Sequence, residues 1–308
     1  MKPRFDIIRA SRWFFLLSGA ITVAGVIVFA LFGFNLSTDF KSGSEVQFEL
    51  NQRVPEARVR QMFASIGLPL GDTSLTVGGI QQNVVMVTLP EQLTAKQISE
   101  IQAAEHRFFP DAKQDIQVNS VDPFVAEQTA RKAVYAVLAA AACIVVYIAI
   151  RFEFRFAISG IIALLHDAFI VLAAFALLRR EVDLTFVAAL LTIVGYSIND
   201  TIVIFDRIRE NLKIDKPQTV DELRAVVNKS LWQVMNRSIR TVLTVLIAAV
   251  ILYFFGGISI RNFTFALIIG LVSGAYSSIF IASPIWVAWR SRSMKKASRG
   301  DKAAPIPE

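Results

Sequence analysis

Six long apolar runs limit the folds that are open to this chain. They cover residues 13–34, 133–150, 156–178, 184–205, 241–255 and 263–289. A helix needs about 20 apolar residues to cross the hydrocarbon core of a bilayer, which is roughly 30 Å thick. The fifth run is the shortest, so its helix has to include flanking residues. Apolar residues make up 54% of the chain, against roughly 45–50% in soluble domains. The sequence therefore predicts a polytopic α-helical membrane protein with six transmembrane helices.

The positions of Lys and Arg predict how these helices are oriented. Twenty basic residues lie in segments 2–12, 151–155, 207–240 and 290–302. The two short loops on the opposite side, 179–183 and 256–262, hold three. Because cytoplasmic loops carry the excess of Lys and Arg, both termini are predicted to be cytoplasmic. The net charge of +7 follows from this topology and requires no nucleic-acid partner.

These features divide the chain into four parts. Residues 1–34 form the cytoplasmic N-terminus and the first transmembrane helix, whose apolar run exceeds the 7–15 residues of a signal-peptide core and is expected to be retained. Residues 35–132 form an extracytoplasmic domain, and residues 133–289 hold transmembrane helices two to six with a cytoplasmic loop at 206–240. Residues 290–308 form a basic cytoplasmic tail.

The polar segment 35–132 alternates between strand and helix patterns. Strands are predicted at 44–50, 74–77, 83–89 and 115–119, and helices at 55–66 and 94–108. The second helix has a capping-box sequence, Thr94-x-x-Gln97. The order β-α-β-β-α-β predicts a small ferredoxin-like α+β domain.

The loop 206–240 contains a second capping box, Thr219-x-x-Glu222, after a breaker at Lys216-Pro217. Apolar residues at helical spacing predict an amphipathic helix over 220–236, lying along the membrane surface. The single cysteine, Cys143, lies in the second apolar run, so no internal disulfide or thiolate metal site is expected. We expect no metal, no cofactor and no enzymatic activity.

The most unusual residues are Asn199 and Asp200, in the middle of the fourth run. A carboxylate at mid-bilayer costs roughly 2.5–3.5 kcal/mol, so a chain that keeps one uses it for ions, protons or an essential partner. Tyr196 and Ser197 precede Asp200 by four and three residues, on the same face of the helix. The alternative is a polar residue that holds two helices together by hydrogen bonding.

Two further runs carry polar residues. The third holds His166-Asp167, and Arg240 stands where the fifth begins. A buried carboxylate away from charge holds its proton, whereas one beside an arginine releases it, and a proton relay requires that contrast. The alternatives are a structural hydrogen-bonded pair at His166-Asp167, and arginines that mark the cytoplasmic boundary.

The sixth run contains Gly270-x-x-x-Gly274 together with Ser273, Ser277 and Ser278. Small residues at this spacing allow two helices to approach closely. We therefore predict a helix-packing seam at Gly270 and Gly274.

Several motifs resemble one known family. They are Leu164-Leu-His-Asp167, the run 195–211, Arg240-Thr241, Tyr253-Phe-Phe-Gly-Gly257 and Ser278-Ile-Phe-Ile-Ala-Ser283. Their order and spacing are similar to those of the SecD/SecF family of protein translocase subunits, within the resistance-nodulation-division superfamily. The resemblance covers essentially the whole chain.

The resemblance implies a subunit of the Sec protein-export machinery in the bacterial cell (inner or plasma) membrane. It would pair with SecD and use the proton motive force in the late stages of translocation. The implied partners are SecD, the SecYEG translocon, YajC and the emerging secreted polypeptide. By motif, Asp200, Arg240 and Asp167 form the proton relay, with Asn199, His166, Tyr196 and Ser197 as supporting polar residues.

Three other functions fit parts of the sequence. Half of a proton-coupled exporter of a small hydrophobic molecule or lipid would use the same carboxylate chemistry, although the outer domain is small for a porter domain. A purely structural assembly subunit would leave Asp200 and Arg240 replaceable. An intramembrane protease would use two aspartates, but its usual Tyr-Asp and Gly-x-Gly-Asp signatures are absent from the sequence.

Overall fold

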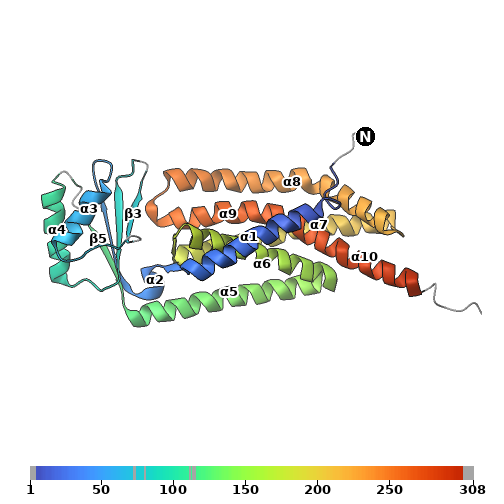
Figure 1. Ribbon diagram of the computed structural model, residues 1–308, viewed down its shortest axis with the longest axis horizontal. Helices are drawn as coiled ribbons and strands as arrows, with labels where there is room; N and C mark the ends of the chain where they lie inside the picture. Colours follow the sequence, from blue (N-terminus) through green and yellow to red (C-terminus); the bar gives the residue numbers. More distant parts are fainter. Residues whose placement is uncertain (1–4, 72–73, 80, 111, 113–115, 301–308) are drawn as a thin grey trace, which may run out of the picture.

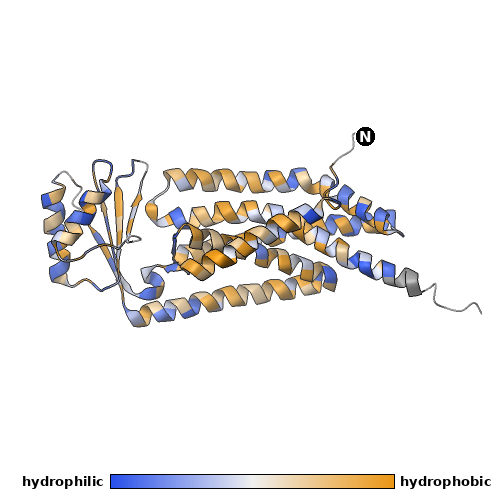
Figure 2. Ribbon diagram, in the orientation of Figure 1, coloured by the Kyte–Doolittle hydropathy of each residue, from blue (hydrophilic) through white to orange (hydrophobic). Residues whose placement is uncertain are grey.

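The computed structural model describes residues 5–71, 74–79, 81–110, 112 and 116–300. The molecule is elongated, with a small α+β domain at one end and a bundle of long helices along the rest (Figure 1). The bundle is apolar over most of its length, whereas polar residues alternate with apolar ones in the α+β domain (Figure 2). The long apolar helices and the α+β domain thus occupy separate parts of the molecule.

Within the described residues, six helices are long and apolar enough to cross a membrane, which confirms the predicted number. The first five are α1 (Ser11–Phe32), α5 (Pro123–Arg151), α6 (Phe154–Leu177), α7 (Leu184–Asp215) and α8 (Val220–Phe255). The sixth combines η1 (Ile258–Ile260), α9 (Arg261–Ser277), the π-helical segment η2 (Ser278–Ala282) and α10 (Ser283–Gly300).

Helix α8 corrects one prediction. Its first turn carries the predicted capping box between Thr219 and Glu222. However, it continues for 36 residues to Phe255, so a separate helix over 220–236 along the membrane surface was wrong. The chain has no Gly or Pro between Val220 and Phe255 to end the helix. The apolar face of its N-terminal part, which includes Leu223 and Val227, is buried in the protein core and not against lipid.

Helix α9 lies at the centre of the bundle against α6, α7 and α8. A Cβ atom on Gly270 would collide with Ile193 of α7, and one on Gly274 would lie 3.2 Å from the Cβ of Ser197. The sixth span is accordingly 61% buried in its most apolar window, whereas α1, α5 and α8 are 11%, 6% and 11% buried. These three helices therefore present most of their apolar surface to lipid or to a partner.

The α+β domain follows α1 in the chain and precedes α5. Its elements are β2 (Gly43–Glu49), α3 (Glu56–Ser65), β3 (Leu75–Gly78), β4 (Val84–Leu89), α4 (Ala95–Phe108) and β5 (Gln117–Val121). The strands form an antiparallel sheet in the order β3-β4-β2-β5. The last strand begins two residues later than predicted, because Gln117 to Val121 pair with β2; Asp115 lies outside the described residues.

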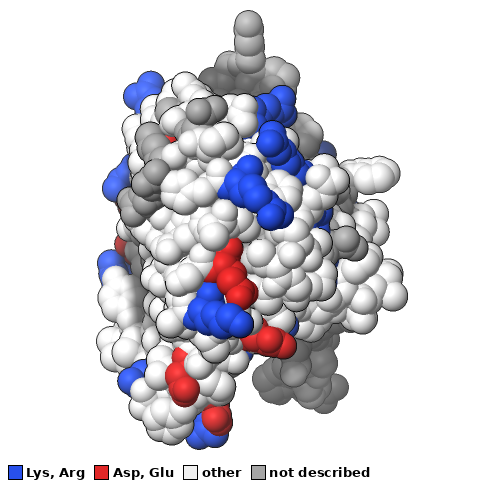
Figure 3. Space-filling view, turned by 90° about the vertical axis from the view of Figure 1, so that its left-hand side faces the viewer, with Lys and Arg blue, Asp and Glu red and all other residues white. Residues whose placement is uncertain are grey.

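Helices α3 and α4 cover one face of this sheet. Val46, Phe48 and Val85 pack against Phe63 and Ile101 in a core of their own. Thr94 and Gln97 form the predicted capping box at the start of α4. The face of the domain that points away from the bundle carries basic and acidic side chains among a larger uncharged surface (Figure 3).

A short joint connects the domain to the bundle. Strand β1 (Asn35–Leu36) pairs in parallel with β6 (Glu181–Val182), in the loop between α6 and α7. The adjacent turn α2 (Thr38–Lys41) places the Asp39 carboxylate where it accepts a 3.0 Å hydrogen bond from the Leu184 amide. Arg261, at the start of α9, donates a 2.8 Å bond to the Val77 carbonyl of β3. These contacts hold the sheet against one end of the bundle.

Candidate functional site

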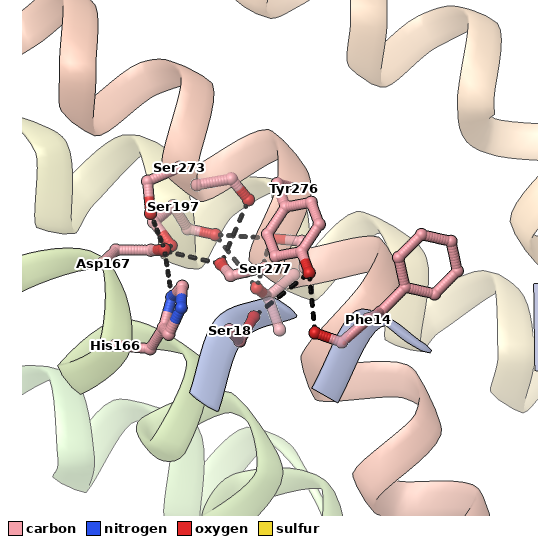
Figure 4. Close-up of polar contacts among 11 residues, drawn as sticks. Phe14, Ser18, His166, Asp167, Ser197, Ser273, Tyr276 and Ser277 are labelled. Carbon is pink, nitrogen blue, oxygen red and sulfur yellow. Dashed lines mark hydrogen bonds and ion pairs between the residues drawn. The ribbon is translucent and has the colours of Figure 1, made fainter. Parts of the chain in front are cut away.

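The Asp167 carboxylate is the centre of a polar cluster inside the bundle. It is fully buried and accepts hydrogen bonds from Ser197 (2.7 Å), Ser273 (2.6 Å) and Ser277 (2.6 Å). The His166 ring nitrogen Nδ1 lies 3.3 Å from Asp167 Oδ1, the oxygen that also accepts the hydrogen bond from Ser273. Figure 4 shows these side chains converging on Asp167 from α6, α7 and α9. The cluster joins three helices through one carboxylate.

Local helix geometry explains why α9 supplies two of these donors. Ser273 and Ser277 are four residues apart, so they lie one turn apart on the same face of the helix. Gly270 and Gly274 of that helix allow α7 to approach closely enough for Ser197 to reach Asp167. The sequence identified these serines only as part of a packing seam. The spacing of four residues between the two serines is the sequence signal that could have identified them as a pair of donors to an aspartate on another helix.

The sixth span changes to π-helical geometry directly after Ser277. Ser278 begins this segment and shares a 2.8 Å hydrogen bond with Thr201 of α7. The Ser283 hydroxyl donates to the Ser278 carbonyl at 3.1 Å, which satisfies one backbone acceptor at the irregularity. Single π-helical turns within α-helices frequently occur at functional sites. The irregularity therefore begins at the residue after Ser277, which donates to Asp167.

Tyr276 extends polar contacts from α9 to α1. Its hydroxyl lies 3.1 Å from the Ser18 hydroxyl and donates a 3.0 Å bond to the Phe14 carbonyl (Figure 4). The His166 ring lies beside the Tyr276 ring, with the centroids 6.4 Å apart. His166 Nε2 is buried without a hydrogen-bond partner among the described residues. The sequence did not single out Tyr276 or Ser18.

Asp200 has a different environment from Asp167. Its side chain is buried, at 9% exposure, but Oδ2 has no hydrogen-bond partner in the described part of the chain. Ser238 of α8 is also buried, and its hydroxyl is the side-chain group that interacts with the Asp200 carboxylate, although the two form no hydrogen bond of normal geometry among the described residues. Arg237 of α8 is the charged residue that interacts electrostatically with the Asp200 carboxylate. Asp200 thus keeps one oxygen available to bind a proton or another polar group.

The other predicted residues differ in whether they reach these two carboxylates. Ser197 donates to Asp167, whereas Tyr196 and Asn199 are exposed on α7. Arg240 is exposed on α8 and makes no contact with Asp200 among the described hydrogen bonds and ion pairs. No group of three His, Cys, Asp or Glu side chains within the described residues is arranged to hold a metal ion.

Comparison with known proteins identifies the family. A protein-family model described as protein export membrane protein SecD/SecF, C-terminal, matches residues 100–292. The chain belongs to this family. It is 99% identical over 308 residues to the protein translocase subunit SecF of Alicyclobacillus acidocaldarius, and each protein is covered completely. Such agreement over the whole length confirms the resemblance that the motifs indicated.

Longer members of the SecD/SecF family contain the same unit. The chain is 42% identical over 96% of its length to the protein translocase subunit SecDF of Bacillus subtilis, and covers 39% of that protein. The crystal structure of SecDF from Thermus thermophilus, described as a translocon-associated membrane protein, matches with a TM-score of 0.82 and 33% identity. That match covers 94% of this chain and 39% of the SecDF chain. The chain is therefore a multi-pass membrane protein with the architecture of one part of SecDF.

Proposed function

We propose that the chain is the SecF-type subunit of the Sec protein-export machinery, working with SecD and using the proton motive force to assist late translocation. The observation that carries this proposal is full-length identity of 99% to a curated SecF. The buried carboxylates supply the chemistry that a proton-driven subunit needs. Each elementary charge that crosses the membrane potential yields about 2.3 kcal/mol per 100 mV.

The contrast between the two carboxylates supports a division of roles. Asp167 accepts three hydroxyl hydrogen bonds and joins α6, α7 and α9. Asp200 lies one helical turn further along α7 than Ser197, with an oxygen that no described group satisfies. In our proposal Asp200 gains and loses the proton, with Arg240 as its partner in the assembled complex. The Asp167 cluster, with His166, transmits the resulting shift of α7 to α6 and α9.

An exposed polar face on α7 supports a partner within the membrane. Tyr196 and Asn199 lie on this face, and a Cβ atom on Gly195 would have no neighbour within 4 Å. Polar groups exposed to hydrocarbon are costly, so they are expected to face a protein partner. SecD is the partner that we propose, because fused SecDF relatives carry this unit in a chain more than twice as long.

We further propose that the α+β domain is extracytoplasmic and ferredoxin-like. Its element order and its strand order β3-β4-β2-β5 support that fold. The asymmetry of basic residues supports cytoplasmic termini, a cytoplasmic α7–α8 turn and the division at residues 34, 132 and 289 in a bacterial cell membrane. In this placement the domain meets the emerging polypeptide, and the complex works beside SecYEG, with YajC as a further partner.

Export assays with inverted membrane vesicles test the proposal. Vesicles that contain the chain with SecD are compared with and without an imposed proton gradient. Asp200→Asn keeps the volume of the side chain but cannot ionise, so gradient stimulation of export should be lost while SecD still co-purifies. The control is Asp206→Asn, which changes a carboxylate of the same helix that pairs with Arg151 at 3.3 Å outside the bundle core. Full stimulation in Asp200→Asn would refute the relay role.

A further inference from the structure

A cavity of about 430 Å³ lies between the α+β domain and the bundle. The sheet contributes the side chains of β3 and β4 to one wall, and the turns at the ends of α6 and α8 form the other. The polar residues of the second wall include Arg179, Arg180, Arg261 and Asn262. They come from the α6–α7 loop and from the start of α9.

The only basic residues in segments 179–183 and 256–262 are Arg179, Arg180 and Arg261. The general bias of basic residues toward the opposite side makes each of them an exception. All three nevertheless line one cavity. In the described residues, no carboxylate lies within ion-pair distance of any of them. The cavity therefore concentrates positive charge that the described protein does not neutralise.

Arg180 and Arg261 are held close to each other by aromatic rings. Their guanidinium carbons lie 5.5 Å and 5.2 Å from the centroid of the Tyr253 ring, and Arg180 lies 4.2 Å from that of Phe265. Arg180 donates to the Tyr253 hydroxyl at 2.6 Å and to Asn262 at 3.3 Å. Burial lowers the pKa of Arg180; the interaction with Tyr253 opposes this shift, and the neighbouring positive charge of Arg261 adds to it. A bound anion would relieve this repulsion.

Arg261 also has an unused donor. Its terminal nitrogen binds the Val77 carbonyl, but its Nε is buried without a hydrogen-bond partner among the described residues. Leaving a buried donor without an acceptor is unfavourable. An acceptor oxygen supplied by a ligand would satisfy it.

Glu181 is the one acidic residue in the lining, but it does not neutralise the arginines. Its Oε1 accepts a 3.0 Å hydrogen bond from Thr88 of β4. The charged groups that interact with its carboxylate are other carboxylates, those of Glu45, Asp183 and Asp39. Glu181 thus belongs to a separate acidic group at the joint, and the arginine side of the cavity remains positive.

Exposed apolar side chains lie at the ends of α6 and α8, close in the chain to residues that line the cavity. Leu177 and Leu178 are 58% and 55% exposed directly before Arg179, and Phe254 and Phe255 are 62% and 67% exposed. Arginine beside an apolar belt is typical of the bilayer interface, where the stem lies in the acyl region and the charge reaches the headgroups. Guanidinium groups also bind phosphate oxygens with charge-assisted, often bidentate, hydrogen bonds.

We propose that this cavity binds the phosphate of an anionic phospholipid headgroup from the leaflet on the side of the α+β domain. Arg180 and Arg261 are the principal phosphate ligands, and the acyl chains lie along the exposed leucine and phenylalanine side chains. Because Arg261 also binds β3, the bound lipid fixes the sheet to the membrane surface. A zwitterionic headgroup binds more weakly, since its own cation offsets the phosphate.

Thermal unfolding of the full chain in detergent tests the site without any export assay, so its outcome is independent of the proposed function. Short-chain phosphatidylglycerol, short-chain phosphatidylcholine and inorganic phosphate are titrated separately. We expect phosphatidylglycerol alone to raise the unfolding midpoint. No shift with phosphatidylglycerol would overturn the proposal, as would an equal shift with inorganic phosphate, which would indicate a free-anion site.

A double variant tests the ligands. Losing a charge-assisted hydrogen bond costs about 1.5–3 kcal/mol, so Arg180→Gln/Arg261→Gln should bind phosphatidylglycerol at least about tenfold more weakly. The matched control is Arg131→Gln/Lys132→Gln, which removes the same charge from exposed positions of α5 on the same side of the bundle. Native mass spectrometry measures the bound lipid directly. Equal lipid binding by the cavity variant and the control would show that the arginines only hold the sheet, contrary to the proposal. The wild-type titration decides the question even if the cavity variant does not fold.

Discussion

The Ser277 hydroxyl donates a 2.6 Å hydrogen bond to the Asp167 carboxylate, across 110 residues of sequence. Ser273 and Ser197 complete the set of hydroxyl donors. A carboxylate satisfied in this way holds its helices together, whereas Asp200 has an oxygen with no described partner. The two aspartates of the helix bundle therefore have different hydrogen-bonding environments.

Replacing Asp167 with Asn should destabilise the isolated chain. The amide nitrogen cannot accept a hydrogen bond, so at least one buried serine hydroxyl loses its acceptor. We expect a loss of about 1–3 kcal/mol in the free energy of unfolding in detergent. Asp206→Asn is the control, because Asp206 lies at an exposed ion pair and should change stability by less than about 1 kcal/mol. Equal stability of the Asp167 and Asp206 variants would contradict the assigned role.

Gly270 should not tolerate even alanine. The added methyl group would collide with Ile193 of α7, and overpacking of this kind costs about 1–3 kcal/mol. Gly195→Ala provides a matched control, because the same methyl group would meet no atom within 4 Å there and helix propensity should improve. Thermal unfolding of the two variants should shift the midpoint in opposite directions.

Glu181 should make the folding stability depend on pH. Burial raises its pKa from 4.5 to about 6, with Glu45, Asp183 and Asp39 adding to the increase and the Thr88 hydrogen bond opposing it. An ionised Glu181 is less favourable in the folded than in the unfolded chain. The folded chain therefore becomes less stable as the pH rises from 4.5 to about 6, where Glu181 is ionised in the unfolded chain but still protonated in the folded one.

The size of this effect is at most about 2 kcal/mol between pH 4.5 and 6. Glu181→Gln removes the titration and should flatten the stability profile over that interval, while raising stability at pH 7. Unfolding measured by denaturant at several pH values provides the test. Glu91, an exposed carboxylate next to β4, gives the control substitution Glu91→Gln. An unchanged slope in the Glu181 variant would contradict the assignment.

The arginine partner of Asp200 can be identified in the complex with SecD. Arg240→Met should abolish gradient-stimulated export if Arg240 contacts Asp200 in the assembled state, as we propose. In the isolated chain, Arg237 is the arginine that interacts electrostatically with the Asp200 carboxylate. Arg237→Met is therefore the informative comparison. Loss of stimulation in Arg237→Met alone would assign the pairing to Arg237 and reject Arg240.

The sequence by itself determined the features that depend on neighbouring residues along the chain. A run of apolar residues long enough to cross a bilayer must be helical, because the backbone has to satisfy its own hydrogen bonds in lipid. This rule predicted six spans without any knowledge of packing. The capping boxes at Thr94 and Thr219 were likewise confirmed, because each involves groups only three residues apart.

Some boundaries were missed although local information existed. The uninterrupted helix α8 was predicted in two parts, because the change from amphipathic to fully apolar sequence was interpreted as a change of direction. The helix continues because no breaker interrupts it, and because Leu223 and Val227 face a protein core rather than a membrane surface. What an apolar face packs against is a property of the tertiary structure.

Only the tertiary structure decided which polar residues meet. Ser197 was predicted to support Asp200 because the two share a helix, yet it donates to Asp167 on another helix. Arg179 and Arg180 of the α6–α7 loop line the same cavity as Arg261 at the start of α9, about 80 residues further along the chain. Helical periodicity specifies which residues share a face. The partner of that face depends on how helices pack, and here close approach at Gly270 and Gly274 brings α7 and α9 together around one buried carboxylate.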